Sequence, residues 1–172
     1  MEIRILDFLQ TLRTPFLDKF FSIFTLLGNR GEIWILIFIV LFFNKKTKSV
    51  AIYGFIALVL SALSIEVIIK PIIQRPRPFV ANPLIELLIK EPFGYSFPSG
   101  HATSSFAAAF FLYLNKVKYR TVYLLLAILM AFSRLYVYVH YPSDVLVGVL
   151  LGMLIALGVN KQMKKDKKIT LN

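Results

Sequence analysis

The sequence predicts an all-α integral membrane protein, a six-transmembrane-helix bundle that forms a single domain over residues 1–172. Composition is the first indication, because 58% of the residues are hydrophobic, against roughly 45–50% in soluble domains. Pattern is the second, since long apolar runs alternate with short basic segments that would lie outside a bilayer. Aromatic content is the third: 16 Phe, 8 Tyr and 1 Trp suit lipid-facing and interfacial surfaces.

The predicted chain begins with a helix at the membrane interface. Residues 3–12 place apolar side chains among polar ones, as in an amphipathic helix lying on a membrane; the alternative is that they start the first span. Spans one and two are predicted over residues 14–28 and 31–44. Thr14-Pro15 would begin the first, because proline fits the first helical position. Both apolar runs are short, since a span needs about 20 residues.

Four further spans are expected, at residues 49–70, 99–115, 120–138 and 143–160. The active-site loop of residues 70–98 is rich in proline, which excludes a continuing helix. Within this loop, between spans three and four, residues 84–89 are predicted to form a short interfacial helix. The basic tail of residues 161–172 would not cross a bilayer.

Three residues inside the spans have structural interpretations. Glu66 lies near the end of the third span, where an ion pair with a nearby base is favoured over a catalytic role. Gly148 and Gly152 have the spacing that lets two helices approach closely, and packing within the chain is favoured over dimerisation. The oligomeric state is left open.

Basic residues are distributed unevenly between the predicted loops. In the six-span layout the N-terminal segment, the loops after spans two and four, and the tail share one side and hold most of the lysines. The positive-inside rule places that side, with both termini, in the cytoplasm. The net charge of +11 does not indicate a nucleic-acid partner, because the lysines separate apolar runs instead of forming one basic face. No signal-peptide pattern opens the chain.

Cysteine is absent, which excludes disulfides, thiolate metal sites and thiol nucleophiles. The candidate chemistry lies instead in three polar clusters on the predicted outer face. The first is Lys70 followed by Arg77-Pro78. Arginine is a planar fork that grips two phosphate oxygens, and lysine is a point charge. Alone, these bases would also fit side chains that snorkel at the interface, and nearby Arg75 is a possible headgroup contact.

The second cluster, Pro98-Ser99-Gly100-His101, lies where the fourth span begins. The free N–H groups of a helix start suit an anion, and Gly100 lets a ligand approach the backbone closely. Ser99 adds a hydroxyl, and His101 can exchange a proton near neutral pH. The simpler interpretation is that Ser99 is an N-cap and His101 an interfacial histidine.

The third cluster runs from Ser133 to Asp144. Arg134 adds a fixed charge, and Pro142 is placed to be the first residue of the last span. Asp144 could accept one imidazole N–H of His140 and leave the other ring nitrogen free to attack, which is the orienting role of a carboxylate in a catalytic triad.

In order and spacing, these three motifs resemble the type-2 phosphatidic acid phosphatase family, which shares its site with vanadium haloperoxidases. The resemblance implies a phosphatase that needs no metal or other cofactor. His140 would attack phosphorus and form a phosphohistidine, Asp144 would orient His140, and His101 would protonate the leaving oxygen and then activate water. The residues that would bind the phosphoryl oxygens are Lys70, Arg77, Ser99, Gly100 and Arg134.

The function expected from this resemblance is hydrolysis of a lipid phosphomonoester or diphosphate at the outer face of a bacterial inner membrane. Undecaprenyl diphosphate is the first expectation, on family frequency; the alternatives are lipid A 1-phosphate, phosphatidylglycerol phosphate and phosphatidic acid. The substrate would enter from the bilayer, so membrane lipids are the expected partners. A transporter or channel is the non-enzyme alternative, disfavoured because the charges gather at one face instead of along a midplane path. Membrane embedding disfavours a haloperoxidase.

Overall fold

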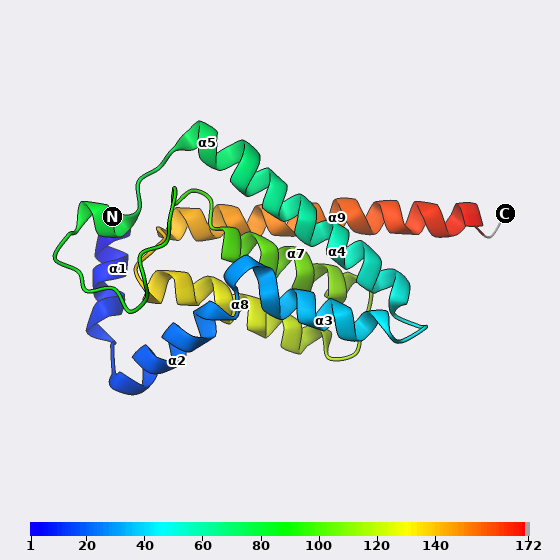
Figure 1. Ribbon diagram of the computed structural model, residues 1–172, viewed down its shortest axis with the longest axis horizontal. Helices are drawn as coiled ribbons and strands as arrows, with labels where there is room; N and C mark the ends of the chain where they lie inside the picture. The colour runs from blue at the N-terminus through cyan, green and yellow to red at the C-terminus, as the bar shows by residue number, and fades with distance from the viewer. Residues whose placement is uncertain (171–172) are drawn as a thin grey trace.

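The structure is a computed structural model that describes residues 1–170, with the side chains of residues 1–166. Within these residues all regular secondary structure is helical (Figure 1), which confirms the all-α fold. The elements are α1 (Glu2–Thr11), α2 (Pro15–Leu26), η1 (Asn29–Gly31), α3 (Glu32–Phe42), α4 (Lys48–Ala62), η2 (Leu63–Ile69), α5 (Lys70–Ile73), α6 (Pro78–Ala81), α7 (Gly100–Leu114), α8 (Arg120–Tyr136) and α9 (Pro142–Thr170).

The N-terminal helix is amphipathic, as predicted. Leu6 is fully buried, whereas Ile5, Phe8 and Leu12 are exposed. One face of α1 therefore packs against the rest of the protein, and apolar side chains on its other face remain exposed, as in an interfacial helix. The next helix begins where expected, with Pro15 at its first position. Thr14 caps it by accepting a hydrogen bond from the backbone N–H of Leu17 at 3.2 Å.

The first two predicted spans form a bent pair of short helices. α2 and α3 meet at 53° across η1, where Arg30 and Gly31 have left-handed φ angles of 52° and 74°. By length and apolar composition, two of the described helical stretches can cross a membrane, Lys48–Ala81 and Pro142–Asp166, and a third if the bent pair is one span. The protein is thus an integral membrane protein, and the count of six spans is not confirmed.

The N-terminal helix and the C-terminal end of α9 lie at opposite ends of the bundle (Figure 1). Glu2 contacts Arg75 and Ser143, which flank the predicted site. The N-terminus therefore lies at the site end of the bundle, whereas both termini were predicted on the side away from the site. The physical reason is that α2 and α3 together lead only once from the site end to the opposite end (Figure 1).

The centre of the bundle is α7, which packs against α4, α8 and α9 (Figure 1). Its buried face is made largely of small residues, and Gly148 and Gly152 of α9 lie directly against it. A Cβ atom added at Gly148 would lie 2.8 Å from the Ser99 carbonyl oxygen, closer than carbon and oxygen atoms pack. Packing within the chain is therefore the use of these glycines. α3 is joined to α7 by a hydrogen bond from Trp34 Nε1 to Ser105 Oγ at 2.9 Å.

The prediction of a helix over residues 84–89 is wrong. The short helices in that loop are α5 and α6, and residues 84–89 are irregular. A six-residue helix is too short to be stable alone, and here the backbone has other partners: Arg13 donates to the Glu86 carbonyl and Ser22 to the Leu88 carbonyl. The tail predicted from residue 161 continues α9 as far as Thr170, and residues 171–172 lie outside the described part of the chain.

Candidate active site

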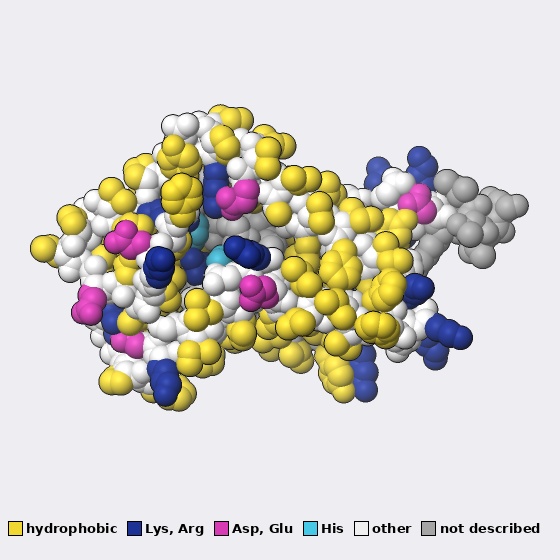
Figure 2. Space-filling view, viewed as in Figure 1, with side chains coloured by type: hydrophobic (Ala, Val, Ile, Leu, Met, Phe, Trp, Pro, Cys, Tyr) yellow, Lys and Arg dark blue, Asp and Glu magenta, His cyan; other side chains and the backbone are white. Residues whose placement is uncertain are grey.

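A cavity of about 570 Å³ opens at the end of the bundle that carries the three motifs. Figure 2 shows histidine side chains inside this hollow, with Lys and Arg side chains around it. Six of the eight predicted site residues line the cavity: Lys70, Arg77, Gly100, His101, Arg134 and His140. The other two, Ser99 and Asp144, are fully buried behind it.

His140 and Asp144 lie on either side of the start of α9. Proline at the first helical position begins the helix at Pro142, which puts the carboxylate in its first turn. Asp144 Oδ2 lies 3.5 Å from His140 Nδ1, longer than a hydrogen bond, and accepts the backbone N–H of Tyr141 at 2.8 Å. The carboxylate thus faces Nδ1, and Nε2 is the nitrogen that faces Arg77.

The imidazole of His140 is buried among cations. Burial, and then the positive charges of Arg134, Arg77 and Lys70, lower the pKa of His140 well below 6.5. The ring is therefore neutral at pH 7, and one nitrogen carries a free lone pair. A neutral imidazole in a cationic cavity is suited to attack an anionic phosphoryl group.

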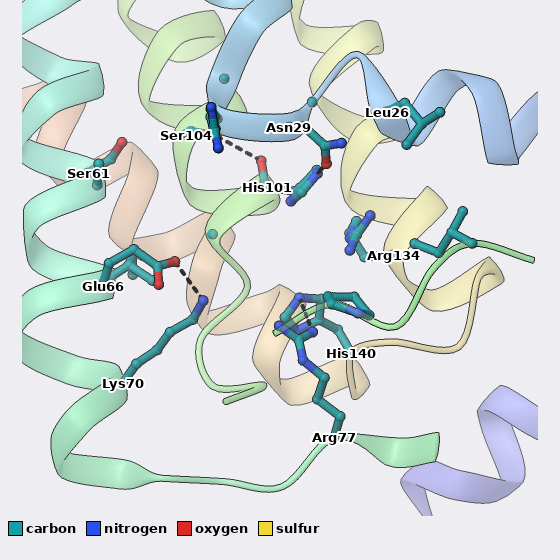
Figure 3. Close-up of a pocket in the computed structure, with 18 of the residues that line it drawn as sticks. Leu26, Asn29, Ser61, Glu66, Lys70, Arg77, His101, Ser104, Arg134 and His140 are labelled. Atoms are coloured by element: carbon teal, nitrogen blue, oxygen red, sulfur yellow. Dashed lines mark hydrogen bonds and ion pairs between the residues drawn. The ribbon is translucent and has the colours of Figure 1, made fainter. Parts of the chain in front are cut away.

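Arg77 is fixed beside His140 by backbone carbonyls. Its Nε donates to Gly94 O at 2.9 Å and Nη1 to Val139 O at 3.0 Å. Nη1 also lies 3.4 Å from His140 Nε2, and Figure 3 shows the two side chains directed toward each other. The guanidinium is buried, and no carboxylate among the described side chains contacts it, so this position favours an anion.

Lys70 reaches the cavity from the end of the π-helical segment η2. Its Nζ lies 2.6 Å from Oε1 of Glu66 one turn earlier (Figure 3), which confirms the ion-pair interpretation of Glu66. The lysine is buried whereas the Glu66 side chain is 57% exposed. The pair therefore holds the ammonium at the cavity wall.

Arg134 enters the cavity from the last turn of α8. Its Nη1 donates to the hydroxyl of Thr25 on α2, and Ser133 Oγ donates to the same hydroxyl at 3.2 Å. Nε of Arg134 is buried and has no hydrogen-bond partner among the described residues. A buried N–H group normally has one, so Arg134 has donor capacity to offer a ligand.

The second motif begins α7. Ser99 Oγ accepts the backbone N–H of Ala102, so this serine is the N-cap of α7, the simpler of the two roles considered for it. Its own N–H donates to the Asp144 carbonyl at 3.0 Å, which joins the second motif to the third. His101 lines the cavity, and its Nε2 lies 3.2 Å from Asn29 Oδ1 in the bend between α2 and α3.

Several residues around the site were not predicted. The cavity is also lined by Asn29, Arg30, Lys90 and Glu91, none of which belongs to a sequence motif. The one sequence signal near Asn29 and Arg30 is the turn from Gly28 to Gly31, which lies between two short apolar runs. Arg75 was expected as a possible headgroup contact. The structure instead engages it with carboxylates, through Nη1 to Asp144 Oδ1 and Nη2 to Glu2 Oε2, both at 2.6 Å.

Comparison with known proteins gives consistent matches. The profile of the PAP2 superfamily matches residues 49–168. An undecaprenyl-diphosphatase from Sulfolobus acidocaldarius is 36% identical over 126 residues, which cover 72% of this chain and 60% of that protein. Two solved structures are similar with a TM-score of 0.75 and 28% identity. One is Aquifex aeolicus LpxE, over 93% of this chain and 94% of that chain. The other is a PAP2-type phosphatidylglycerolphosphate phosphatase from Bacillus subtilis, over 95% and 85%.

The chain spans 49% to 60% of the length of three of the curated relatives it matches. The profile match nevertheless covers well over half of this chain and contains all three motifs, from Lys70 to Asp144. The resemblance predicted from those motifs is confirmed. The chain belongs to the PAP2 superfamily.

Proposed function

We propose that the protein is a lipid phosphatase that hydrolyses a phosphomonoester or diphosphate on a lipid headgroup and needs no metal ion. The supporting observation is that one neutral imidazole and three buried cations line the same cavity. His140 Nε2 lies 3.4 Å from Arg77 Nη1, and the cationic groups of Lys70 and Arg134 line the same space (Figure 3). Phosphoryl transfer depends mainly on positioning and charge stabilisation, and fixed cations supply both.

In the proposed reaction, His140 Nε2 attacks phosphorus. The bond from phosphorus to the leaving oxygen breaks as His101 donates a proton to that oxygen, and a phosphohistidine remains. His101 then takes a proton from water, the water oxygen bonds to phosphorus, and the phosphorus–nitrogen bond breaks. Inorganic phosphate leaves, and both histidines return to their starting states. Asp144 keeps Nδ1 of His140 oriented throughout.

The phosphoryl oxygens are bound by the cations and by the start of α7. Lys70, Arg77 and Arg134 supply charge, and the backbone N–H groups at Gly100 and His101 lie at the positive end of the helix. Ser99 contributes by capping this helix end, which fixes where those N–H groups point.

The cavity also has an apolar wall, which fits a lipid substrate. Leu26 of α2, Leu58 of α4 and Ile65 of η2 line it. A lipid can therefore place its phosphate among the cations while its tail stays next to apolar side chains and the bilayer. This arrangement favours a membrane-embedded substrate over a soluble phosphate ester.

We propose a bacterial inner membrane as the location, with the site on the outer face. Two observations support this orientation: the loop around residues 44–48 and the C-terminal part of α9 both lie at the end of the bundle away from the site (Figure 1), and both segments are rich in lysine in the sequence. Basic segments stay in the cytoplasm. In this arrangement α2 and α3 form one bent crossing, the chain crosses five times, and α1 lies on the outer surface.

Undecaprenyl diphosphate is the first substrate we propose, on the resemblance to the undecaprenyl-diphosphatase named above. Phosphatidylglycerol phosphate, phosphatidic acid and lipid A 1-phosphate are the alternatives, because the cations bind a phosphate group that all four share.

The test is phosphate release by the purified protein in detergent, with EDTA present, from each of the four lipids. We expect release from at least one, inhibition by vanadate, and a loss of at least about 1,000-fold in His140→Ala, the range seen when a nucleophile is removed. Lys116→Ala, an exposed change away from the cavity, is the matched control. No release from any lipid by the wild type would leave the transporter alternative, and unchanged release by His140→Ala would rule out the phosphohistidine.

A further inference from the structure

A row of charged side chains leads from the N-terminal helix to the carboxylate behind His140. Glu2 Oε2 lies 2.6 Å from Arg75 Nη2, and Arg75 Nη1 lies 2.6 Å from Asp144 Oδ1. Asp144 Oδ2 in turn faces His140 Nδ1 at 3.5 Å. These contacts join residues that lie far apart in the sequence, with Glu2 and Arg75 separated by 73 positions.

Arg75 is held firmly at the centre of this row. Nη1 also donates to Ser143 Oγ at 2.7 Å, and the guanidinium lies over the Tyr141 ring at 3.8 Å from its centroid. The Arg75 carbonyl accepts the backbone N–H of Ser96 at 2.9 Å. Backbone and side chain are both fixed, and the guanidinium is not among the groups that line the cavity. Its contacts therefore do not match those of a headgroup ligand.

Glu2 fixes the other side of the guanidinium. Oε1 accepts the backbone N–H of Ser143 at 2.9 Å while Oε2 pairs with Arg75. Burial alone would raise the pKa of Glu2, but hydrogen bonds with Ser143 and Arg75 outweigh it and lower that pKa. Glu2 is therefore an anion at neutral pH, and it braces the first turn of α9 and Arg75 together.

The position of Asp144 depends on these partners. The carboxylate is fully buried, with Oδ1 bonded to Arg75 and Oδ2 to the backbone N–H of Tyr141. With both oxygens engaged, rotation about the Cβ–Cγ bond is blocked, and one oxygen stays toward His140. Without Arg75, the buried carboxylate would lose its neighbouring cation, which disfavours its ionised form.

We propose that Arg75 is a positioning residue for the hydrolytic reaction, acting through Asp144, and that Glu2 of α1 holds Arg75 for this role. Through Glu2 alone, the N-terminal helix thereby contributes to the position of the catalytic carboxylate. This inference rests on the proposed phosphatase function and adds to it two residues that lie outside the three motifs.

The experiment is a double-mutant cycle on the lipid that the wild type hydrolyses. Arg75→Gln should lower kcat by about tenfold, the scale of a broken contact within one hydrogen-bonded network, with KM nearly unchanged because Arg75 does not line the cavity. Glu2→Gln should lower kcat by about threefold. The double variant should be no slower than Arg75→Gln alone, since both changes interrupt the same row of contacts.

Arg4→Gln, which removes an exposed charge from the same helix, is the control and should keep wild-type kcat. Arg75→Lys should recover only part of the rate, because one ammonium cannot bridge two carboxylates as the fork does. Circular dichroism and thermal unfolding in detergent show whether each variant is folded. Wild-type kcat in folded Arg75→Gln, a rise in KM alone, or independent effects of the two changes would each overturn the inference. None of these results would contradict the proposed function, because that function is tested by phosphate release from the wild type and from His140→Ala.

Discussion

At the scale of single residues, the site combines groups that are fully engaged with groups that are left open. Arg77 is bonded to three backbone carbonyls, and Lys70 to Glu66. Arg134 in contrast keeps Nε without a partner, and the pKa of His140 is lowered so that its ring is neutral. The engaged cations are held in fixed positions around the cavity, and the open groups have bonding capacity left for a ligand.

Thr25 is the residue through which α2 supports the site. Thr25→Val keeps the shape but removes the hydroxyl that accepts from Arg134 Nη1 and Ser133 Oγ. We expect a loss of about 1–3 kcal/mol of stability, because a buried donor is left unsatisfied, and about a tenfold fall in kcat/KM. Thermal unfolding and phosphate release measure the two effects.

Thr121→Val is the control for this change, since Thr121 lies exposed on α8. Equal unfolding temperatures for the two variants would show that the Thr25 hydroxyl does not support Arg134.

Local sequence patterns identified the three motifs but not the residues that support them. A helix start such as Pro98-Ser99 is visible because the cap and the helix are adjacent. The pairing of Arg75 with Glu2 is not, because no spacing within the chain connects positions 73 residues apart. Arg75 was noticed only as a base next to a motif.

At the scale of helices, the contact between α7 and α9 sets the site. α7 begins with Ser99 as its cap, and α9 has Asp144 in its first turn. Gly148 and Gly152 let the two backbones approach, and the Ser99 N–H reaches the Asp144 carbonyl at 3.0 Å. Helices with small residues at their interface pack closely in membranes, so packing in the middle of the bundle determines how the second and third motifs meet.

Gly152→Val tests this contact. A Cβ atom at residue 152 would lie 2.8 Å from the Ala107 backbone nitrogen, so the helices must separate. Overpacking of this kind costs about 1–3 kcal/mol, and we expect a lower unfolding temperature together with reduced phosphate release.

The same change at residue 158 is the matched control. A Cβ atom there has no neighbour within 4 Å. Gly158→Val, in the same helix, should therefore keep the unfolding temperature and the rate of phosphate release of the wild type. If both valine variants behave alike, helix propensity and not the α7–α9 contact accounts for the effect.

Helices of this protein were predictable where a long apolar run is bounded by caps or basic residues, as for α4, α7, α8 and α9. The first two runs were ambiguous in a physical sense. Each is about half the length that a bilayer requires, and a turn with glycine at both ends can either reverse the chain or bend it. Side-chain periodicity does not distinguish the two outcomes. Residues 84–89 were misassigned because their apolar side chains pack against other helices without forming a helix.

At the scale of the whole molecule, α1 and the site lie at one end and the loop after α3 lies at the other (Figure 1). The chain contains no cysteine, so single cysteines can report this arrangement. We expect an impermeant maleimide to label Arg4→Cys and Phe93→Cys in intact spheroplasts, and to label Lys46→Cys only after permeabilisation.

The three positions are exposed in the structure, and retained phosphate release shows that each variant is folded. A six-crossing chain would instead protect Arg4→Cys together with Lys46→Cys. That result would contradict the single bent crossing proposed for α2 and α3.

The cavity with a cationic wall and an apolar wall has a kinetic consequence. In the proposed reaction its two products depart into different phases, phosphate into water and the shortened lipid into the bilayer. Turnover then depends on the mole fraction of substrate in the membrane, not on its amount per volume of solution. The lipid product competes in proportion to its share of the surface, whereas phosphate competes through its bulk concentration. The surrounding membrane therefore acts both as the substrate reservoir and as the sink for the lipid product.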